Sequence, residues 1–210
     1  MNKITLTIFF YLGILLCNIG AATIIFQDEF NTDTGWVLGF GNQGRPSGDY
    51  AGSSINTSGI SDHSDIHFNE DGTEIAATNN FFKAINNGIN SASSISQSIS
   101  VTAGLTYNVY FRYTGSHSGS HTFNSTFTLG GDSATTGTLA APSASWTSGS
   151  YSFSPTTSGN ATLAFTDVNV PINSDLLLDS VVVAAVPEPS SAILLSLTSM
   201  MVFLGRKRHV

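Results

Sequence analysis

The sequence predicts an all-β protein built around one β-sandwich domain. Stretches in which apolar residues alternate with small polar ones recur through its second half, as in strands with one buried face. Turn-forming Gly, Ser, Thr and Asn residues separate these stretches, and charged residues make up only 10% of the chain. No helical period of 3.6 residues is present outside the two ends. Several short strands joined by polar turns are typical of a sandwich or jelly roll.

The first half contains few strong strand signals. A β-branched and aromatic run predicts a first strand at residues 23–26, and short strands are expected at 74–78 and 80–85. Residues 40–59 are rich in Gly, Ser and Asn and are predicted to form a loop. Residues 60–71 carry four acids and two histidines.

The second half predicts longer strands, at residues 95–101, 106–114, 123–129, 151–153, 161–166 and 176–183. The strand at 106–114 places aromatic and apolar side chains on one face and polar ones on the other. Its inner face holds Tyr107, Val109, Phe111 and Tyr113, and its outer face holds Asn108, Tyr110 and Arg112.

The N-terminus reads as a signal peptide at residues 1–22. Lys3 supplies the positive charge, residues 4–17 are apolar, and the small residues Gly20, Ala21 and Ala22 suit signal peptidase, with the cut after Ala22. Cys17 is the only cysteine, so the mature chain is expected to contain no disulfide.

The C-terminal segment, residues 186–210, has three parts in a fixed order. It begins with Pro187, Glu188 and Pro189, continues with an apolar run at 192–204, and ends with Arg206, Lys207 and Arg208. The run is short for a bilayer span, which usually takes about 17–25 residues. Cations beside an apolar segment stay cytoplasmic, so we expect a short transmembrane helix with the preceding domain outside.

This order resembles the PEP-CTERM sorting tail of exported bacterial proteins, carried by the Pro-Glu-Pro motif and the basic trio. The resemblance implies that an exosortase, a membrane-embedded enzyme, processes the tail after signal peptidase has acted. It also implies an intermediate anchored in the inner membrane, and then a place at the cell surface or in the extracellular matrix.

Between these ends, residues 23–185 form one predicted domain. It holds 13 of the 14 acids but only Arg45, Lys83 and Arg112 as cations, a net charge of −10. Nucleic-acid phosphates require a basic face, so this charge argues against nucleic acid as a partner.

Residues 94–183 resemble the galactose-binding-like jelly rolls that include many carbohydrate-binding modules. The matching pieces, in order, are 95–101, Ala103 and Gly104, 107–111, Trp146, 151–153, 163–165 and 178–181. The resemblance implies a structural Ca²⁺ ion held near the first and last strands. Asp28, Glu29 and Asp179 occupy the comparable places.

A sugar site is predicted on the outer face of the strand at 106–114. An aromatic ring can stack on a pyranose while amide and guanidinium groups bind its hydroxyls, as Tyr110, Asn108 and Arg112 could do. The alternative is an ordinary solvated face. Three further aromatic residues are candidates for ligand contact or for core packing: Trp36, Tyr50 and Trp146.

Catalytic and zinc chemistry have weaker support. Two histidine pairs four residues apart, His63 with His67 and His117 with His121, lie in acidic or Ser/Gly-rich stretches where no acid is placed as a general base. No Gly-x-Ser-x-Gly motif is present. Paired carboxylates remain candidates for glycan cleavage: Asp62, Asp65, Glu70 and Asp71.

We therefore expect an exported, non-catalytic surface or matrix protein that binds polysaccharide or serves a structural role in an exopolysaccharide layer. Two alternatives stay open at this point: a small secreted glycan hydrolase or lyase, and a structural spacer that binds nothing.

Overall fold

The computed structural model describes residues 21–30, 36–40, 48–51, 66–76, 81–84, 93–115, 121–142, 145–169 and 176–187. All their regular structure is β-strand. Among these residues no helix is long and apolar enough to cross a bilayer. The predicted signal peptide up to Gly20 and the predicted sorting tail beyond Pro187 lie outside the described part.

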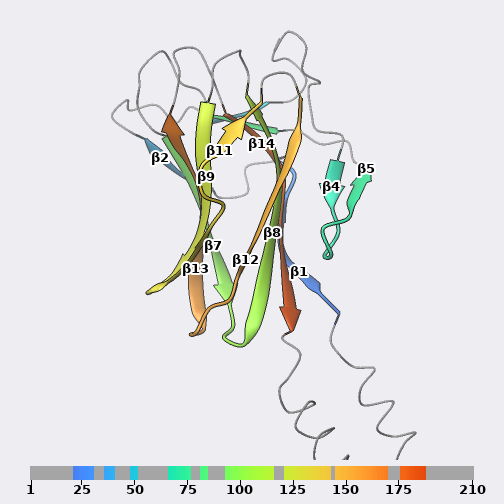
Figure 1. Cartoon of the computed structure of the whole chain (residues 1–210), viewed down its shortest axis with the longest axis vertical. Helices are drawn as coiled ribbons and strands as arrows, with labels where there is room; N and C mark the ends of the chain where they lie inside the picture. The colour runs from blue at the N-terminus through green and yellow to red at the C-terminus, as the bar shows by residue number, and fades with distance from the viewer. Residues whose placement is uncertain are drawn as a thin grey trace, which may run out of the picture.

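Two antiparallel sheets face each other, and Figure 1 shows them nearly edge-on. The first sheet has the order β12–β8–β14–β6–β3, with β1 also paired to β14, and the second has the order β10–β9–β13–β7–β2, with β11 paired to β9. The strands are β1 (Thr23–Asp28), β2 (Val37–Phe40), β3 (Gly48–Ala51), β4 (Ile66–Phe68), β5 (Glu74–Ala76), β6 (Phe81–Ala84), β7 (Ser93–Val101), β8 (Leu105–Gly115), β9 (His121–Leu129), β10 (Asp132–Thr135), β11 (Leu139–Ala141), β12 (Thr147–Phe153), β13 (Gly159–Asn169) and β14 (Leu176–Pro187).

Aromatic rings from both sheets fill the space between them. Phe111 on β8 meets Phe165 on β13 edge to face, with ring centroids 5.0 Å apart. Two further ring pairs, Tyr113 with Phe123 and Phe127 with Phe153, also bridge the sheets. Such pairs add about 0.5–1.5 kcal/mol each beyond the apolar area that they bury. The core therefore ties the two layers together along their length.

The predicted faces of β8 are confirmed. Its four aromatic and apolar residues at odd positions from 107 to 113 are buried, while Asn108, Tyr110 and Arg112 are half-buried on the outer face. Ala161, Leu163 and Phe165 on β13 are buried in the same way. Alternation thus located the core side of the long strands correctly.

Several short strands were missed. The predicted loop at 40–59 contains the end of β2 and all of β3, and three further short strands had no prediction: β4, β10 and β11. Three or four residues give too few positions for alternation to show. The turn before β10 is a two-residue hairpin loop, Gly130–Gly131, in which Gly130 has a φ of 58°.

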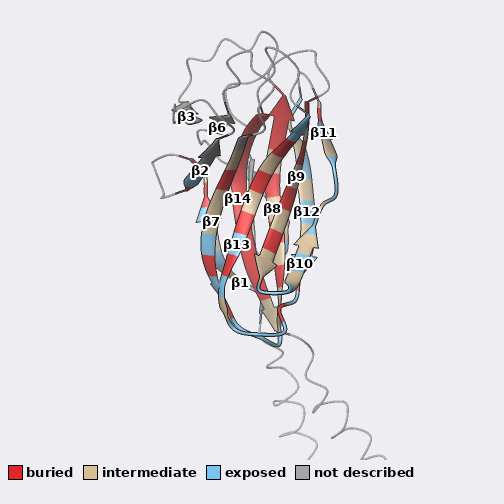
Figure 2. Cartoon of the chain, turned by 90° about the vertical axis from the view of Figure 1, so that its left-hand side faces the viewer, coloured by how far each residue is buried: buried red, intermediate tan, exposed pale blue. Residues whose placement is uncertain are grey.

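The last strand is longer than predicted and reaches Pro187. It is buried from Leu176 to Ala185, and Figure 2 shows β14 red along most of its length. Its neighbours are β8 on one side, and β6 and β1 on the other. Thr23 pairs with Ala185, so the first strand begins where the last one ends.

Strands β4 and β5 form a separate two-stranded sheet that we call the cover hairpin, residues 66–76. Figure 1 shows it outside the first sheet, on the side away from the second. β4 packs on β14 and β8, so the cover hairpin lies against the outer face that carries the predicted sugar site.

Candidate ligand-binding face

The tip of the cover hairpin is a tight loop fitted over Tyr110. Gly72 N–H donates to the Asn69 carbonyl at 3.0 Å, and the Asp71 carboxylate accepts from the Thr73 N–H at 2.8 Å. Gly72 has a φ of +81°, and a Cβ built there would lie 2.4 Å from Tyr110 Cε1. Only glycine suits this position, because both the left-handed backbone and the ring exclude a side chain.

Tyr110 therefore lies beneath the hairpin. Its ring contacts that of Phe68, a buried residue of β4, with centroids 5.8 Å apart. Burial raises the pKa of the Tyr110 hydroxyl, a hydrogen bond with Asn108 opposes this, and the negative charge of Asp71 raises the pKa further. The ring stabilises the hairpin, and the hydroxyl end lies near Asn108 and Asp71.

Arg112 is held by the same hairpin. Its Nη1 donates to Glu74 Oε1 at 3.1 Å and to Ser148 Oγ at 2.8 Å, and Ser148 also donates to Glu74. The Arg112 side chain is only 12% exposed. The guanidinium that the sequence assigned to sugar hydroxyls is thus bound within the protein.

Beyond the hairpin, the outer face continues as a line of hydrogen-bonding side chains. Ser152 Oγ donates to Asn108 Oδ1 at 2.7 Å, and the hydroxyls of Thr106 and Ser154 lie 2.8 Å apart. We call Thr106, Asn108, Tyr110, Ser152 and Ser154 the polar row. Ser152 and Ser154 are exposed, and the three residues of β8 are half-buried.

Sequence reasoning missed the β12 side of this row. Its signal was available, because Ser148, Ser150 and Ser152 alternate along the strand and pair with Arg112, Tyr110 and Asn108. Alternating serines place hydroxyls on one face of a strand. The contribution of the hairpin had no comparable local signal.

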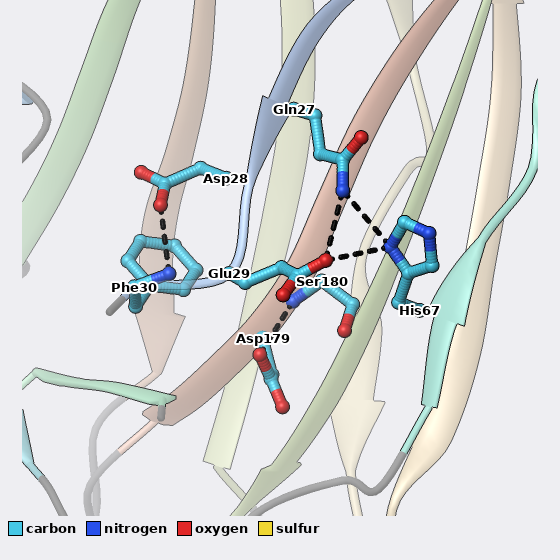
Figure 3. Close-up of polar contacts among 7 residues, drawn as sticks. All are labelled: Gln27, Asp28, Glu29, Phe30, His67, Asp179 and Ser180. Carbon is cyan, nitrogen blue, oxygen red and sulfur yellow. Dashed lines mark hydrogen bonds and ion pairs between the residues drawn. The ribbon is translucent and has the colours of Figure 1, made fainter. Parts of the chain in front are cut away.

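The three predicted calcium ligands make polar contacts within the protein (Figure 3). Asp28 accepts from the Phe30 N–H at 2.7 Å and from Trp36 Nε1 at 2.5 Å, and it is 3% exposed. Glu29 Oε1 lies 2.8 Å from His67 Nδ1. Buried Asp179 accepts from the Ser180 N–H at 2.7 Å.

These contacts already involve carboxylate oxygens of all three acids. Within the described residues, no group of three or more His, Cys, Asp or Glu side chains is placed to hold a metal ion. Ca²⁺ takes about six to eight oxygen ligands, and both Asp28 oxygens already accept hydrogen bonds from the protein. Calcium binding by Asp28, Glu29 and Asp179 stays an untested prediction.

The other candidate residues that the structure describes lie in different parts of the molecule. Trp36 is buried in the core, which agrees with the core-packing alternative. His121 lies in the sandwich interior with its Nε2 2.8 Å from buried Asp167, and Glu70 and Asp71 are exposed on the cover hairpin. Pro187 ends β14 and Trp146 is half-buried. The remaining candidates lie outside the described side chains: Tyr50, Asp62, His63, Asp65, His117, Glu188, Pro189, Arg206, Lys207 and Arg208.

Comparison with known proteins confirms the fold. No protein-family model matches the chain, and no curated protein matches it either. Among solved structures, the CBM22-1 xylan-binding domain from Paenibacillus barcinonensis Xyn10C is 13% identical with a TM-score of 0.50, over 80% of this chain and 97% of that one. A Stig cyclase, Fisc from Fischerella sp. TAU, has the same identity and TM-score over 80% of this chain and 99% of that one. At this identity both likenesses show the jelly-roll β-sandwich alone.

Proposed function

We propose that this protein is a non-catalytic, exported glycan-binding protein of a bacterial cell surface or matrix, and that it binds polysaccharide along the polar row. The observation that supports this most is the Asn108–Ser152 pair beside the Tyr110 hydroxyl. Amide and hydroxyl groups both donate and accept hydrogen bonds, as sugar hydroxyls do. The Asn108 oxygen accepts from Ser152, and the same amide also hydrogen-bonds the Tyr110 hydroxyl. Likeness to a xylan-binding domain agrees with this class of ligand.

We also propose that the protein is exported and then sorted through its tail. Signal peptidase removes residues 1–22, and an exosortase recognises the tail that begins with Pro187, Glu188 and Pro189. Because Thr23 pairs with Ala185, both processed segments join the domain at the same end. A chain held in the inner membrane by its tail then presents the opposite end of the sandwich outward.

A glycan array on the mature chain tests the proposal. We expect binding to at least one polysaccharide without turnover, and a loss of about fivefold or more for Asn108→Ala, since one hydrogen bond contributes roughly 0.5–1.5 kcal/mol. Ser98→Ala is the matched control, because Ser98 is exposed on β7 in the opposite sheet.

The same array separates the alternatives. A blank array supports the spacer, and release of sugar fragments supports the hydrolase or lyase. Repeating the array with a chelator tests for a calcium site. Because Asp28, Glu29 and Asp179 already bond within the protein, we expect glycan binding to stay unchanged. Loss of binding on chelation would support a calcium site.

A further inference from the structure

We infer that the polar row selects neutral glycans and rejects anionic ones, and that the cover hairpin imposes this choice through Glu74 and Asp71. The inference rests on the proposed glycan-binding function and specifies its ligand class. Two observations support it independently: the guanidinium on this face is already paired, and a carboxylate lies next to the row.

The first observation concerns Arg112. It is the only Lys or Arg whose side chain the structure describes. Proteins bind carboxylate or sulfate groups through a guanidinium that is free to donate from its planar fork. Here Nη1 donates to both Glu74 and Ser148, and 12% of the side chain is exposed. The cation therefore has its charge balanced before a ligand arrives.

The second observation concerns Asp71 at the hairpin tip. Its side chain is exposed, and its hydrogen bonds with Thr73 lower the pKa of the carboxyl below its ordinary value, so it is ionised at neutral pH. Asp71 precedes Gly72, which lies against the Tyr110 ring, and its negative charge contributes to raising the pKa of the Tyr110 hydroxyl. A neutral sugar hydroxyl is not repelled by this carboxylate. A uronate or sulfate group placed in the row is repelled by it.

The charge of the whole region acts in the same direction. Residues 23–185 carry 13 acids against three Lys and Arg residues. A polyanion approaching such a surface is repelled over about 10 Å at 0.1 M salt. Anionic chains are thus repelled both at the polar row and at longer range.

The test compares the mature protein with Asp71→Asn/Glu74→Gln on two kinds of probe, by titration calorimetry. The probes are a neutral panel of xylan, β-galactan and β-glucan oligosaccharides, and polygalacturonate as the anionic chain. For the native chain we expect polygalacturonate to bind at least about tenfold more weakly than the best neutral probe, since like-charge contacts cost several kcal/mol.

The double variant leaves the Arg112 charge unbalanced and removes the Asp71 charge. We expect it to gain about tenfold in polygalacturonate affinity, to lose this gain at 1 M salt, and to keep its neutral-glycan affinity within about threefold. Asp132→Asn is a control that removes one negative charge away from the row, on β10 of the other sheet, and it is expected to gain little affinity for polygalacturonate.

Equal binding of both probe types by the native chain overturns the inference while the proposed function stands. Neutral binding with no gain in the double variant overturns the role of the hairpin. Failure to bind any probe overturns the proposed function, and the inference with it.

Discussion

Asp28 illustrates how a single buried carboxylate can be structural. Its two oxygens accept from the Trp36 indole and the Phe30 backbone N–H. Phe30 has a φ of 51°, an uncommon value for a bulky residue, and the hydrogen bond to Asp28 fixes this turn. Trp36 then packs among Phe26, Phe30 and Phe165, at centroid distances of 5.8–6.0 Å. Asp28 thus joins the end of β1 to the core.

Replacing Asp28 by alanine tests this role. Two buried N–H donors lose their acceptor, and each unsatisfied buried group costs roughly 1–3 kcal/mol, so we expect the free energy of unfolding to fall by about 2–6 kcal/mol. Urea unfolding followed by tryptophan fluorescence measures the change. Ser98→Ala should stay within about 0.5 kcal/mol of the native chain. Unchanged stability in Asp28→Ala would contradict the structural role.

At the scale of the element, the cover hairpin depends on its contacts with the sandwich. Its two strands have three residues each, and an isolated hairpin of any length is at best marginally stable in water. The contacts that hold it include those of Phe68 and Gly72 with Tyr110, of Glu74 with Arg112, and of His67 with Glu29. Any change that lifts its tip should therefore expose the Tyr110 ring.

Gly72→Ala makes this change. The new Cβ meets the Tyr110 ring, so we expect faster amide hydrogen exchange across residues 66–76 and a loss of about 1–3 kcal/mol. Gly104→Ala is the matched control, because Gly104 has a φ of +79° with no atom within 4 Å of its built Cβ. It carries the backbone strain without the clash. Equal effects of the two variants would show that the ring contact contributes nothing.

At the scale of the whole molecule, β14 is the strand on which the first sheet depends. It pairs with three other strands and is buried over its first ten residues. Ala184 and Ala185 pair with both β1 and β8, and Val186 and Pro187 continue the pairing with β8. The last strand therefore extends two residues past the predicted boundary at 185.

Chains ending at different residues test this boundary. We expect residues 23–187 to fold, and residues 23–183 to melt about 10 °C lower, because four residues of a central strand lose their partners and each kcal/mol shifts the melting temperature by about 2–4 °C in a chain of this size. Thermal unfolding by circular dichroism measures both. Identical melting temperatures would place the boundary before Ala184.

The sequence by itself determined the all-β class, the long strands and the buried face of each, because alternation is a local property of a strand and is written in consecutive residues. It also placed Asn108 and Tyr110 on the outer face. The tertiary structure alone decided their surroundings. Arg112 meets Glu74 across 38 positions, and Glu74 meets Ser148 across 74, so no local pattern predicts either contact. Asp28 likewise became a hydrogen-bond acceptor for Trp36 because folding brought an indole to it. The partner of a polar side chain depends on which strands become neighbours, and that is settled only when the sheets pack.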